Sequence, residues 1–403
     1  MQNWGGNIEF RASTVHRPAT IDELQEVVVR SRTARVVGTR HSFNRIADDD
    51  TLIDLSMMPA DVVIDPDGST VLVSGNASYG HLAAELHQNG LALHNLASLP
   101  HISIGGAVAT ATHGSGVANG NLATAVRGME ILRSNGEIRW VRGHDLHDAV
   151  VHLGALGVAT RLELAVEPTY NISQIVFEGL TWGDFFDGFS EIMTSAMSVS
   201  VFTTWGPTVG QVWAKQRSGA DPIEIAGATP APEHRHPIPG HDASNCTQQL
   251  GLVGPWHERL PHFRMGFAPS GGDEIQSEWH VSASDGTAAI GALQAVADQF
   301  SEVLMVSEIR TVDADRLLLS PQFDQETVSL HFTWMNRPRG VAEAVDVVEA
   351  ALAPFAPRAH LGKVFSSTRT GIDPARRQRF VDVCREWDPI QMFWNQWLED
   401  NFC

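Results

Sequence analysis

The loop that follows a short apolar run near the N-terminus carries the first residues whose types suggest chemistry. Gly38 allows a sharp turn or the close approach of a ligand, and Thr39, Ser42 and Asn44 supply short hydrogen-bond donors. Successive N–H groups in such a loop can form an anion-binding nest. His41 stands among them and has no evident packing role. The pattern predicts a ligand-binding turn, although a lone histidine is more often structural.

A second candidate is the stretch from Ser98 to Gly116, which is dense in Gly, Ala, Thr and Ser. Small side chains let backbone N–H groups approach a phosphate or a ring edge. The stretch lacks helical periodicity and is not a GxGxxG motif that opens a helix after a strand, so a Rossmann domain is not indicated. Ile102, Ile104 and Val108 favour a chain wrapped around a ligand over an exposed glycine-rich loop.

Three later segments, residues 275–279, 306–312 and 329–334, alternate between polar and apolar side chains, as strands with one buried face do. The polar face would carry Gln276, Glu308, Arg310, His331 and Thr333. Solvated sheet faces explain many such pairs. Ile309, Phe332 and Trp334 mark the opposite face as core. The polar face therefore suits the floor of a pocket for a polyol, whose hydroxyls each need a partner.

Lys363 lies between Gly362 and Val364 in a chain with few lysines. A partly buried lysine has a lowered pKa and can act on a proton, whereas a surface lysine at a turn has no such role. The proline-rich segment 217–246 contains three histidines without carboxylates or cysteines at ligand spacing, so we expect no metal site. No GxSxG motif occurs, so Ser/His/Asp catalysis finds no support.

The elements that must position these residues alternate between helices and strands at first. A capping box at Thr20 to Glu23 predicts a helix, and Ser78 and Gly90 bound a second helix. Short strands are expected at 51–55 and 70–73, a hairpin turns at Asn135-Gly136, and residues 153–158 precede a further strand that runs through Leu164. The composition changes after Pro168, segment 217–246 must be a long irregular loop, and a last helix is expected at 374–387.

Length and composition set further bounds. A chain of 403 residues exceeds the usual size of one core, so two domains are expected. A net charge of −19 argues against nucleic acid or an anionic membrane as partner. It fits a neutral substrate, and it fits equally well a charge that serves solubility alone. The three cysteines form no disulfide framework, and neither a signal peptide nor a membrane-spanning run is evident. We expect a cytoplasmic monomer.

These motifs, in this order, resemble the alditol (xylitol) oxidase branch of the vanillyl-alcohol oxidase or PCMH-type FAD-binding flavoprotein family. The resemblance covers nearly the whole chain. It rests on residues 38–44, 98–103, 109–116 and 153–158, and in the second half on 245–247, 254–263, 308–312, 331–334 and 362–365.

The resemblance implies an α+β fold with two domains. An FAD-binding domain would comprise residues 1–170 completed by 365–403, and a substrate domain with an antiparallel sheet would comprise 171–364. It implies FAD bound covalently through the 8α carbon to His41. Flavin-contacting positions would be Gly38, Thr39, Arg40, Ser42, Phe43, Ser98, Ser103, Gly106, Thr110, Ala111, Thr112, His113, Val158, Ala159, His360 and Asn395.

The resemblance also implies the activity, oxidation of a terminal primary alcohol of a polyol to the aldose with dioxygen reduced to hydrogen peroxide. Ser98, Glu308, Arg310, Thr333 and Lys363 match substrate-contacting positions, with Lys363 and Arg310 acting on the reacting hydroxyl. Ala97 matches a small residue that admits dioxygen. A sugar-1,4-lactone oxidase or dehydrogenase on the same scaffold is the alternative.

This sequence departs from the family in two places. Arg40 stands where many relatives have glycine before the histidine, and the ending 393–397 keeps only part of the family's pattern.

Overall fold

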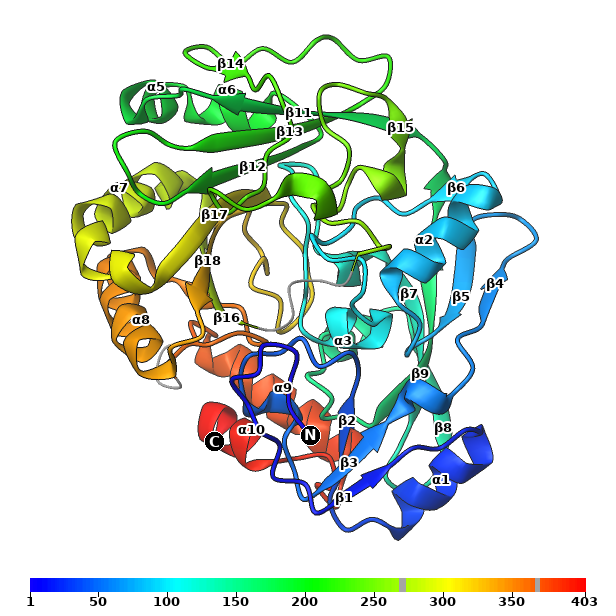
Figure 1. The fold of residues 1–403 in the computed structure, drawn as a ribbon. Coiled ribbons are helices and arrows are strands. Elements are labelled where there is room, and N and C mark those ends of the chain that lie inside the picture. The colour runs from blue at the N-terminus through cyan, green and yellow to red at the C-terminus, as the bar shows by residue number, and fades with distance from the viewer. Residues whose placement is uncertain (268–272, 367–369) are drawn as a thin grey trace.

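The computed structural model describes residues 1–267, 273–366 and 370–403. Within these ranges no helix combines the length and the apolar character needed to cross a bilayer. Two large sheets face one another across the middle of the molecule, and helices pack against both (Figure 1). The α+β arrangement expected from the sequence is confirmed. The division into domains at residues 170 and 364 stays a prediction.

The N-terminal part builds two sheets. A parallel three-stranded sheet has the order β1 (Thr14–His16), β3 (Thr51–Asp54), β2 (Arg35–Val37). A five-stranded antiparallel sheet has the order β4 (Val62–Ile64), β5 (Thr70–Ser74), β9 (Val158–Ala165), β7 (Val126–Leu132), β8 (Ile138–Arg142). Around them lie α1 (Ile21–Arg30), α2 (Tyr79–Gln88), α4 (Asp145–Ala149) and the short pair β6 (Leu91–Ala92) and β10 (Glu167–Pro168).

The predicted helix starts are confirmed by their caps. The Thr20 side chain accepts from Glu23 N at 3.2 Å at the start of α1, and the Glu23 carboxylate accepts from Ala19 N at 2.7 Å. Ser78 accepts from His81 N at the start of α2. Gly90 follows α2 with φ +76, a left-handed conformation that glycine adopts freely.

One expectation in this region is wrong. The lack of helical periodicity between Ser98 and Gly116 predicts no helix there, but residues Ile104–Ala109 form α3. Two glycines in six residues remove the helix propensity that sequence patterning detects. Tertiary packing supplies the stability instead, because Ile104, Ala107 and Val108 are buried.

The second half of the chain forms a nine-stranded sheet. Its order is β14 (Thr229–Pro230), β11 (Asn171–Glu178), β13 (Gln211–Arg217), β12 (Ser198–Thr203), β17 (Leu304–Val312), β18 (Thr327–Met335), β16 (Glu274–Ser282), β19 (Arg358–Ala359), with β15 (Gly254–Pro255) paired to β11. Helices α5 (Trp182–Asp187), α6 (Phe189–Thr194), α7 (Gly286–Val296) and α8 (Pro338–Leu352) cover its outer face (Figure 1). Segment 217–246 is largely irregular, as expected.

The three strands expected from alternation, β17, β18 and β16, are neighbours in this sheet. The apolar side chains of one face, among them Ile309, Phe332 and Trp334, are buried in a cluster with residues of α7 and α8. The opposite face brings the polar residues into register, with Gln276 beside Thr333 and His331 between Glu278 and Glu308. The predicted polar floor therefore exists, and it points away from the helices.

The C-terminal helices α9 (Pro374–Trp387) and α10 (Gln396–Phe402) return to the N-terminal part (Figure 1). Ala34 N donates to Met392 O at 3.0 Å beside β2. Asn395 caps α10 through Leu398 N and donates to three backbone carbonyls of residues 45–48. The tail thus buttresses the loop that follows β2.

Candidate active site

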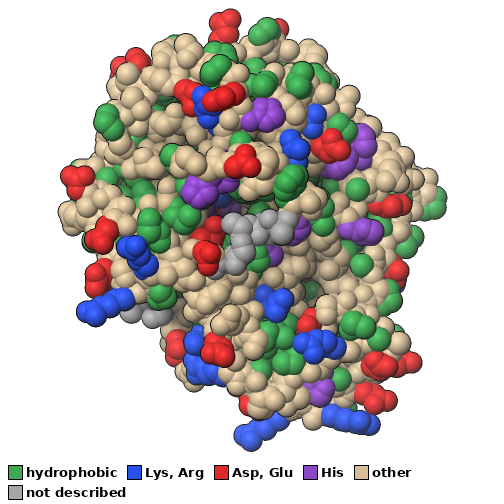
Figure 2. All heavy atoms as spheres, viewed as in Figure 1, with side chains coloured by type: hydrophobic (Ala, Val, Ile, Leu, Met, Phe, Trp, Pro, Cys, Tyr) green, Lys and Arg blue, Asp and Glu red, His purple; other side chains and the backbone are tan. Residues whose placement is uncertain are grey.

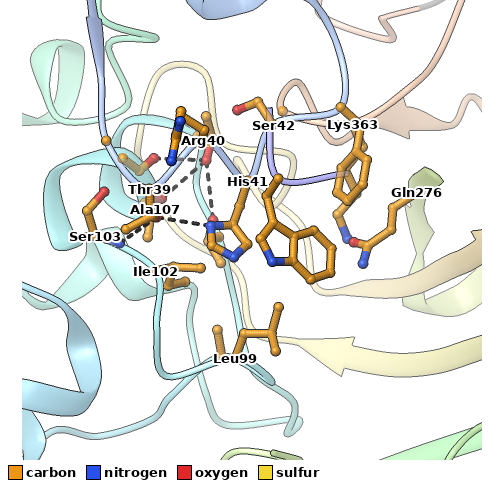
Figure 3. A pocket seen from close by; sticks show the side chains of 18 of the residues that line it. Thr39, Arg40, His41, Ser42, Leu99, Ile102, Ser103, Ala107, Gln276 and Lys363 are labelled. Atoms are coloured by element: carbon orange, nitrogen blue, oxygen red, sulfur yellow. Dashed lines mark hydrogen bonds between the residues drawn. The ribbon is translucent and has the colours of Figure 1, made fainter. Parts of the chain in front are cut away.

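A cavity of about 780 Å³ lies between the loop after β2, the stretch 97–113 and the polar face of the large sheet. Figure 3 shows the Thr39 to Ser42 loop and Ser103 on one side of it, with Gln276 and Lys363 on another. Most sequence-predicted site residues line it. They are Gly38, Thr39, Arg40, His41, Ser42, Phe43, Ser98, Ser103, Gly106, Thr110, Thr112, His113, Ala159, Gln276, Glu308, Arg310, His331, Thr333, His360 and Lys363.

Three residues that were predicted to contact the cofactor do not line this cavity. Ala111 is fully buried behind the wall, at φ +52. Val158 packs with Leu132 and Met392 in a separate apolar cluster. Asn395 holds the backbone of residues 45–48, as described above. Their placement supports structural roles.

The His41 imidazole is held on two sides. Its Nδ1 lies 3.0 Å from Thr39 Oγ1, and that oxygen also accepts from Ser103 N at 3.1 Å (Figure 3). Trp4 stacks on the imidazole with ring centroids 5.0 Å apart. Nε2 is buried and has no hydrogen-bond partner among the described residues. Burial lowers the pKa of His41 to about 4, so the ring is neutral at pH 7.

The departure at Arg40 has a structural consequence. Arg40 has φ +62, in the left-handed region that disfavours side chains by roughly 1–2 kcal/mol. Glycine adopts this conformation without that penalty. The Arg40 carbonyl accepts from Trp4 N at 2.8 Å. The N-terminal segment therefore holds the strained residue and stacks on the histidine next to it.

Glycines let the segments that form one wall of the cavity pack closely together. A Cβ at Gly38 would lie 2.3 Å from Ser103 Oγ, and a Cβ at Gly105 would lie 2.9 Å from Gly75 O. A Cβ at Gly106 would likewise lie 2.9 Å from Ser103 Oγ, and Gly38, Gly105 and Gly106 all line the cavity. Exposed backbone of this kind suits the phosphates of a dinucleotide, whose oxygens accept from N–H groups.

Glu278 is the centre of the polar face. This carboxylate is 1% exposed and accepts from Lys363 Nζ and from Arg310 Nη2, both at 2.7 Å. Ser329 Oγ also donates to it, and His113 Nε2 lies 3.1 Å from its Oε1. Burial by itself raises the pKa of Glu278, but Lys363, His113 and Arg310 hold it well below its usual value. Glu278 is therefore ionised and pairs with both cations.

Glu308 has a second set of partners. Its Oε1 accepts from His262 Nε2 at 2.9 Å and lies 3.6 Å from Arg310 Nε. Burial favours the neutral acid, yet Arg310 and His262 hold the pKa of Glu308 below its usual value. The Lys363 side chain is 14% exposed, and its burial lowers the pKa while Glu278 opposes this shift. Two carboxylates and two cations thus share one buried wall.

His331 completes the floor between these groups. Its Nε2 lies 3.1 Å from Gln276 Oε1, and its Nδ1 is buried without a partner in the described parts of the chain. Burial, followed by the charge of Lys363, holds the pKa of His331 well below its usual value, so the ring is neutral. The wall thus offers donors and acceptors to a neutral, hydroxyl-rich molecule.

Sequence reasoning missed three residues of this network. Glu278 lies on the same face as Gln276, two residues further along β16, so the alternation that selected Gln276 could have found it. His262 and Lys215 carry no such signal. They come from an irregular segment and from β13, and only the tertiary fold brings them to Glu308.

The comparisons with known proteins agree with this geometry. Residues 12–142 match the family described as an FAD binding domain, and residues 273–401 match D-arabinono-1,4-lactone oxidase. The chain is 44% identical to the alditol oxidase of Streptomyces sp. (strain IKD472 / FERM P-14339), over 99% of this chain and 98% of that one.

More distant similarity extends to other oxidoreductases. L-gulono-1,4-lactone dehydrogenase of Mycobacterium tuberculosis (strain ATCC 25618 / H37Rv) is 34% identical over 42% of this chain and 41% of its own length. Among solved structures, a solvent-stable cholesterol oxidase superposes with a TM-score of 0.80 at 13% identity, covering 100% of this chain and 97% of that one. The latter similarity shows the fold alone.

We predict that Glu278→Gln destabilises the protein by ~3–5 kcal/mol, because it leaves Arg310 and Lys363 buried without their shared carboxylate. Glu274→Gln is the matched control. Glu274 lines the same cavity from the same strand, burial raises its pKa, and it forms no ion pair with the described residues. Its replacement should cost about 1 kcal/mol or less.

The measurement is chemical unfolding of both variants and the parent protein, followed by tryptophan fluorescence. Equal losses of stability in the two variants would contradict the conclusion that Glu278 stabilises the buried Arg310 and Lys363.

Proposed function

Because the chain belongs to the alditol oxidase branch of the vanillyl-alcohol oxidase family of FAD-dependent enzymes, we propose that it oxidises a terminal primary alcohol of a polyol, such as xylitol or sorbitol, to the aldose. Dioxygen is the electron acceptor and becomes hydrogen peroxide. The proposal rests on one observation: the cavity lined by His41 and the glycine-rich wall is also lined by Glu308, Arg310, Thr333 and Lys363.

FAD fits the residues of the other wall. The bare backbone at Gly38, Gly105 and Gly106 suits its phosphates, and His41 offers a neutral imidazole with one buried nitrogen that lacks a partner. Alkylation of an imidazole by the 8α carbon requires such a neutral nitrogen. These features support a covalent histidyl link at His41, with Trp4 and Thr39 holding the ring in place.

The polar wall suits a neutral substrate with several hydroxyls. Buried donors and acceptors discriminate strongly against molecules that leave them unpaired. Ser98, Gln276, Glu308, His331 and Thr333 present such groups around the cavity. They would hold the hydroxyls that neighbour the reacting carbon and fix its approach.

Lys363 and Arg310 would act on the reacting hydroxyl. Both are cations anchored by Glu278, so they are oriented before the substrate binds. A positive charge at the hydroxyl oxygen stabilises the alkoxide that forms as its proton leaves. FAD, when bound, accepts the hydride of the carbinol carbon and transfers the electrons to dioxygen. Overall, one alcohol and one dioxygen give one aldehyde and one hydrogen peroxide.

Ala97 supports dioxygen as the acceptor. This residue lines the cavity and is 7% exposed. A methyl side chain leaves more space at the cavity than any larger one, which suits the entry of a small gas molecule. Location in the cytoplasm and a monomeric state remain predictions from the sequence.

One observation favours a second activity. The match of residues 273–401 to D-arabinono-1,4-lactone oxidase covers the strands that carry the polar wall. A sugar-1,4-lactone oxidase or dehydrogenase is therefore the alternative. The full-length similarity to an alditol oxidase favours the polyol.

We predict that xylitol or sorbitol is oxidised with a kcat/KM at least ~10-fold higher than that for L-gulono-1,4-lactone, because the wall is rich in hydroxyl-binding groups. The measurement is peroxide formation with each compound. A preference for the lactone would replace the proposed activity by the alternative.

We predict that the protein is yellow and that the colour stays with the acid-precipitated chain, because the flavin is covalently linked. His41→Ala should retain at most acid-soluble flavin. His101→Ala is the control, since this nearby histidine lies outside the described cavity wall. Covalent flavin in His41→Ala would refute this attachment site.

We predict that Lys363→Met slows anaerobic flavin reduction by xylitol at least ~100-fold, because the alkoxide loses a stabilising cation. Reduction of the same flavin by dithionite should be unchanged, which shows that the cofactor site is intact. A xylitol reduction rate equal to that of the parent protein would refute the role of Lys363.

A further inference from the structure

Lys215 is a buried cation that the proposed chemistry does not use. Lys215 and Lys363 are the only lysines in the sequence. Lys215 lies on β13, is 1% exposed, and forms no ion pair within the described ranges. A lysine in such a position is costly unless each of its N–H groups is bound.

All three N–H groups of the Lys215 ammonium have an acceptor. Nζ donates to Leu260 O, to Pro261 O at 3.3 Å and to His262 Nδ1 at 3.0 Å. An ammonium group has no lone pair and can only donate, so Nδ1 of His262 must accept. This leaves Nδ1 without a proton and places the imidazole proton on Nε2. Lys215 therefore determines the tautomer of His262.

His262 connects this cation to two predicted substrate contacts. Its Nε2 donates to Glu308 Oε1 at 2.9 Å, and its backbone N donates to Ser98 O at 3.0 Å. The rings of Phe202 and Trp213 pack edge-on against the imidazole, at 5.4 and 5.3 Å between centroids. The ring is thus confined, and a change of tautomer cannot be relieved by rotation.

We propose that Lys215 is a positioning residue for polyol recognition, because it keeps the proton on His262 Nε2 and thereby orients Glu308 towards the hydroxyls of the substrate. The inference rests on the proposed function for the class of substrate. The opposite tautomer would aim a nitrogen lone pair at the Glu308 carboxylate, which repels it. Glu308 would then turn away or take up a proton.

The charge balance around Lys215 adds a pH dependence. The groups that face it are His262, Glu308, Arg310 and Cys246, and Gln174 and Ser198 lie beside it on the neighbouring strands. Burial lowers the pKa of Lys215 to about 7. A neutral amine has two N–H groups and one lone pair, so it no longer requires a bare Nδ1 and also allows the opposite tautomer, in which it accepts from Nδ1–H. Polyol affinity should therefore fall as the pH rises through about 7.

The first test is Lys215→Met, with Gln174→Met as the matched control. Gln174 pairs with Lys215 across the β11–β13 ladder and is equally buried, but its side chain bonds to Thr247 and Gln248. Anaerobic stopped-flow reduction by xylitol separates the Kd from the limiting rate. We expect Lys215→Met to raise the Kd at least ~10-fold, with a limiting rate within about threefold and no fall in affinity through pH 7. Gln174→Met should keep the parent Kd and its pH dependence.

A double-mutant cycle with Glu308→Gln shows whether Lys215 acts through Glu308. If it does, Lys215→Met has little further effect on the Kd in the Glu308→Gln background. Additive effects would overturn the proposal, as would a Lys215→Met variant with the parent Kd and pH profile.

Variants of His262 supply an independent route if Lys215→Met does not fold. A glutamine can accept from Lys215 through its carbonyl oxygen and donate to Glu308 through its amide, so His262→Gln should keep the Kd within about threefold. His262→Leu cannot donate and should raise the Kd as Lys215→Met does. The same Kd in both His262 variants would overturn the proposal.

Nitrogen-15 NMR of histidine-labelled protein tests the tautomer without any turnover. The His262 signals, assigned by their loss in His262→Gln, should report a bare Nδ1 and a protonated Nε2. A protonated Nδ1 in the parent protein at pH 6 would overturn the inference. Failure of the proposed function is distinct, because the parent flavin would then not be reduced by xylitol at all.

Discussion

The buried carboxylate of Glu278 is the interaction on which the site depends. It lies on β16 and binds Arg310 from β17 and Lys363 from the turn after β19. Each cation would be costly to bury alone, and a single carboxylate between them removes most of that cost. The hydrogen bonds to Glu278 also direct the two side chains. Their charges are therefore set in place before any substrate arrives, which is the condition for electrostatic stabilisation of a developing alkoxide.

The same turn joins the two walls of the cavity. Gly362 O accepts from Phe43 N at 2.8 Å, while Val364 N donates to Gln276 O at 2.9 Å. Asn44 Nδ2 donates to the carbonyls of Leu361 and Lys363, both at 2.8 Å. The loop that carries His41 is thus hydrogen-bonded to the segment that carries Lys363. The wall that carries His41 and the wall that carries Lys363 are therefore joined by hydrogen bonds to backbone atoms, for which Asn44 is the one side chain used.

The large sheet has to satisfy two opposite demands. One face packs apolar rings against α7 and α8, with Phe332 and Trp334 stacked at 5.0 Å. The other face buries charged side chains, and each of these must be hydrogen-bonded. Figure 2 shows acidic and basic side chains interspersed over one face of the molecule, where solvent screens them. Inside the cavity solvent does not screen the charges. The carboxylates are stabilised instead by direct contacts, Glu278 with Arg310 and Glu308 with His262.

Local patterns in the sequence determined the helix caps, the central strands with their two faces, and the motifs that identify the family, because each depends on residues only a few positions apart. They did not determine α3, whose glycines suppress the local signal, nor the position of Asn395, which serves a distant backbone. Glu278 shares the alternation of its strand, but its role depends on cations from β17 and from residue 363. Lys215 and His262 reach Glu308 only in the folded chain. Only the tertiary structure decides the roles of these residues, because the charge, the tautomer and the direction of a buried side chain depend on partners from separate segments of the chain.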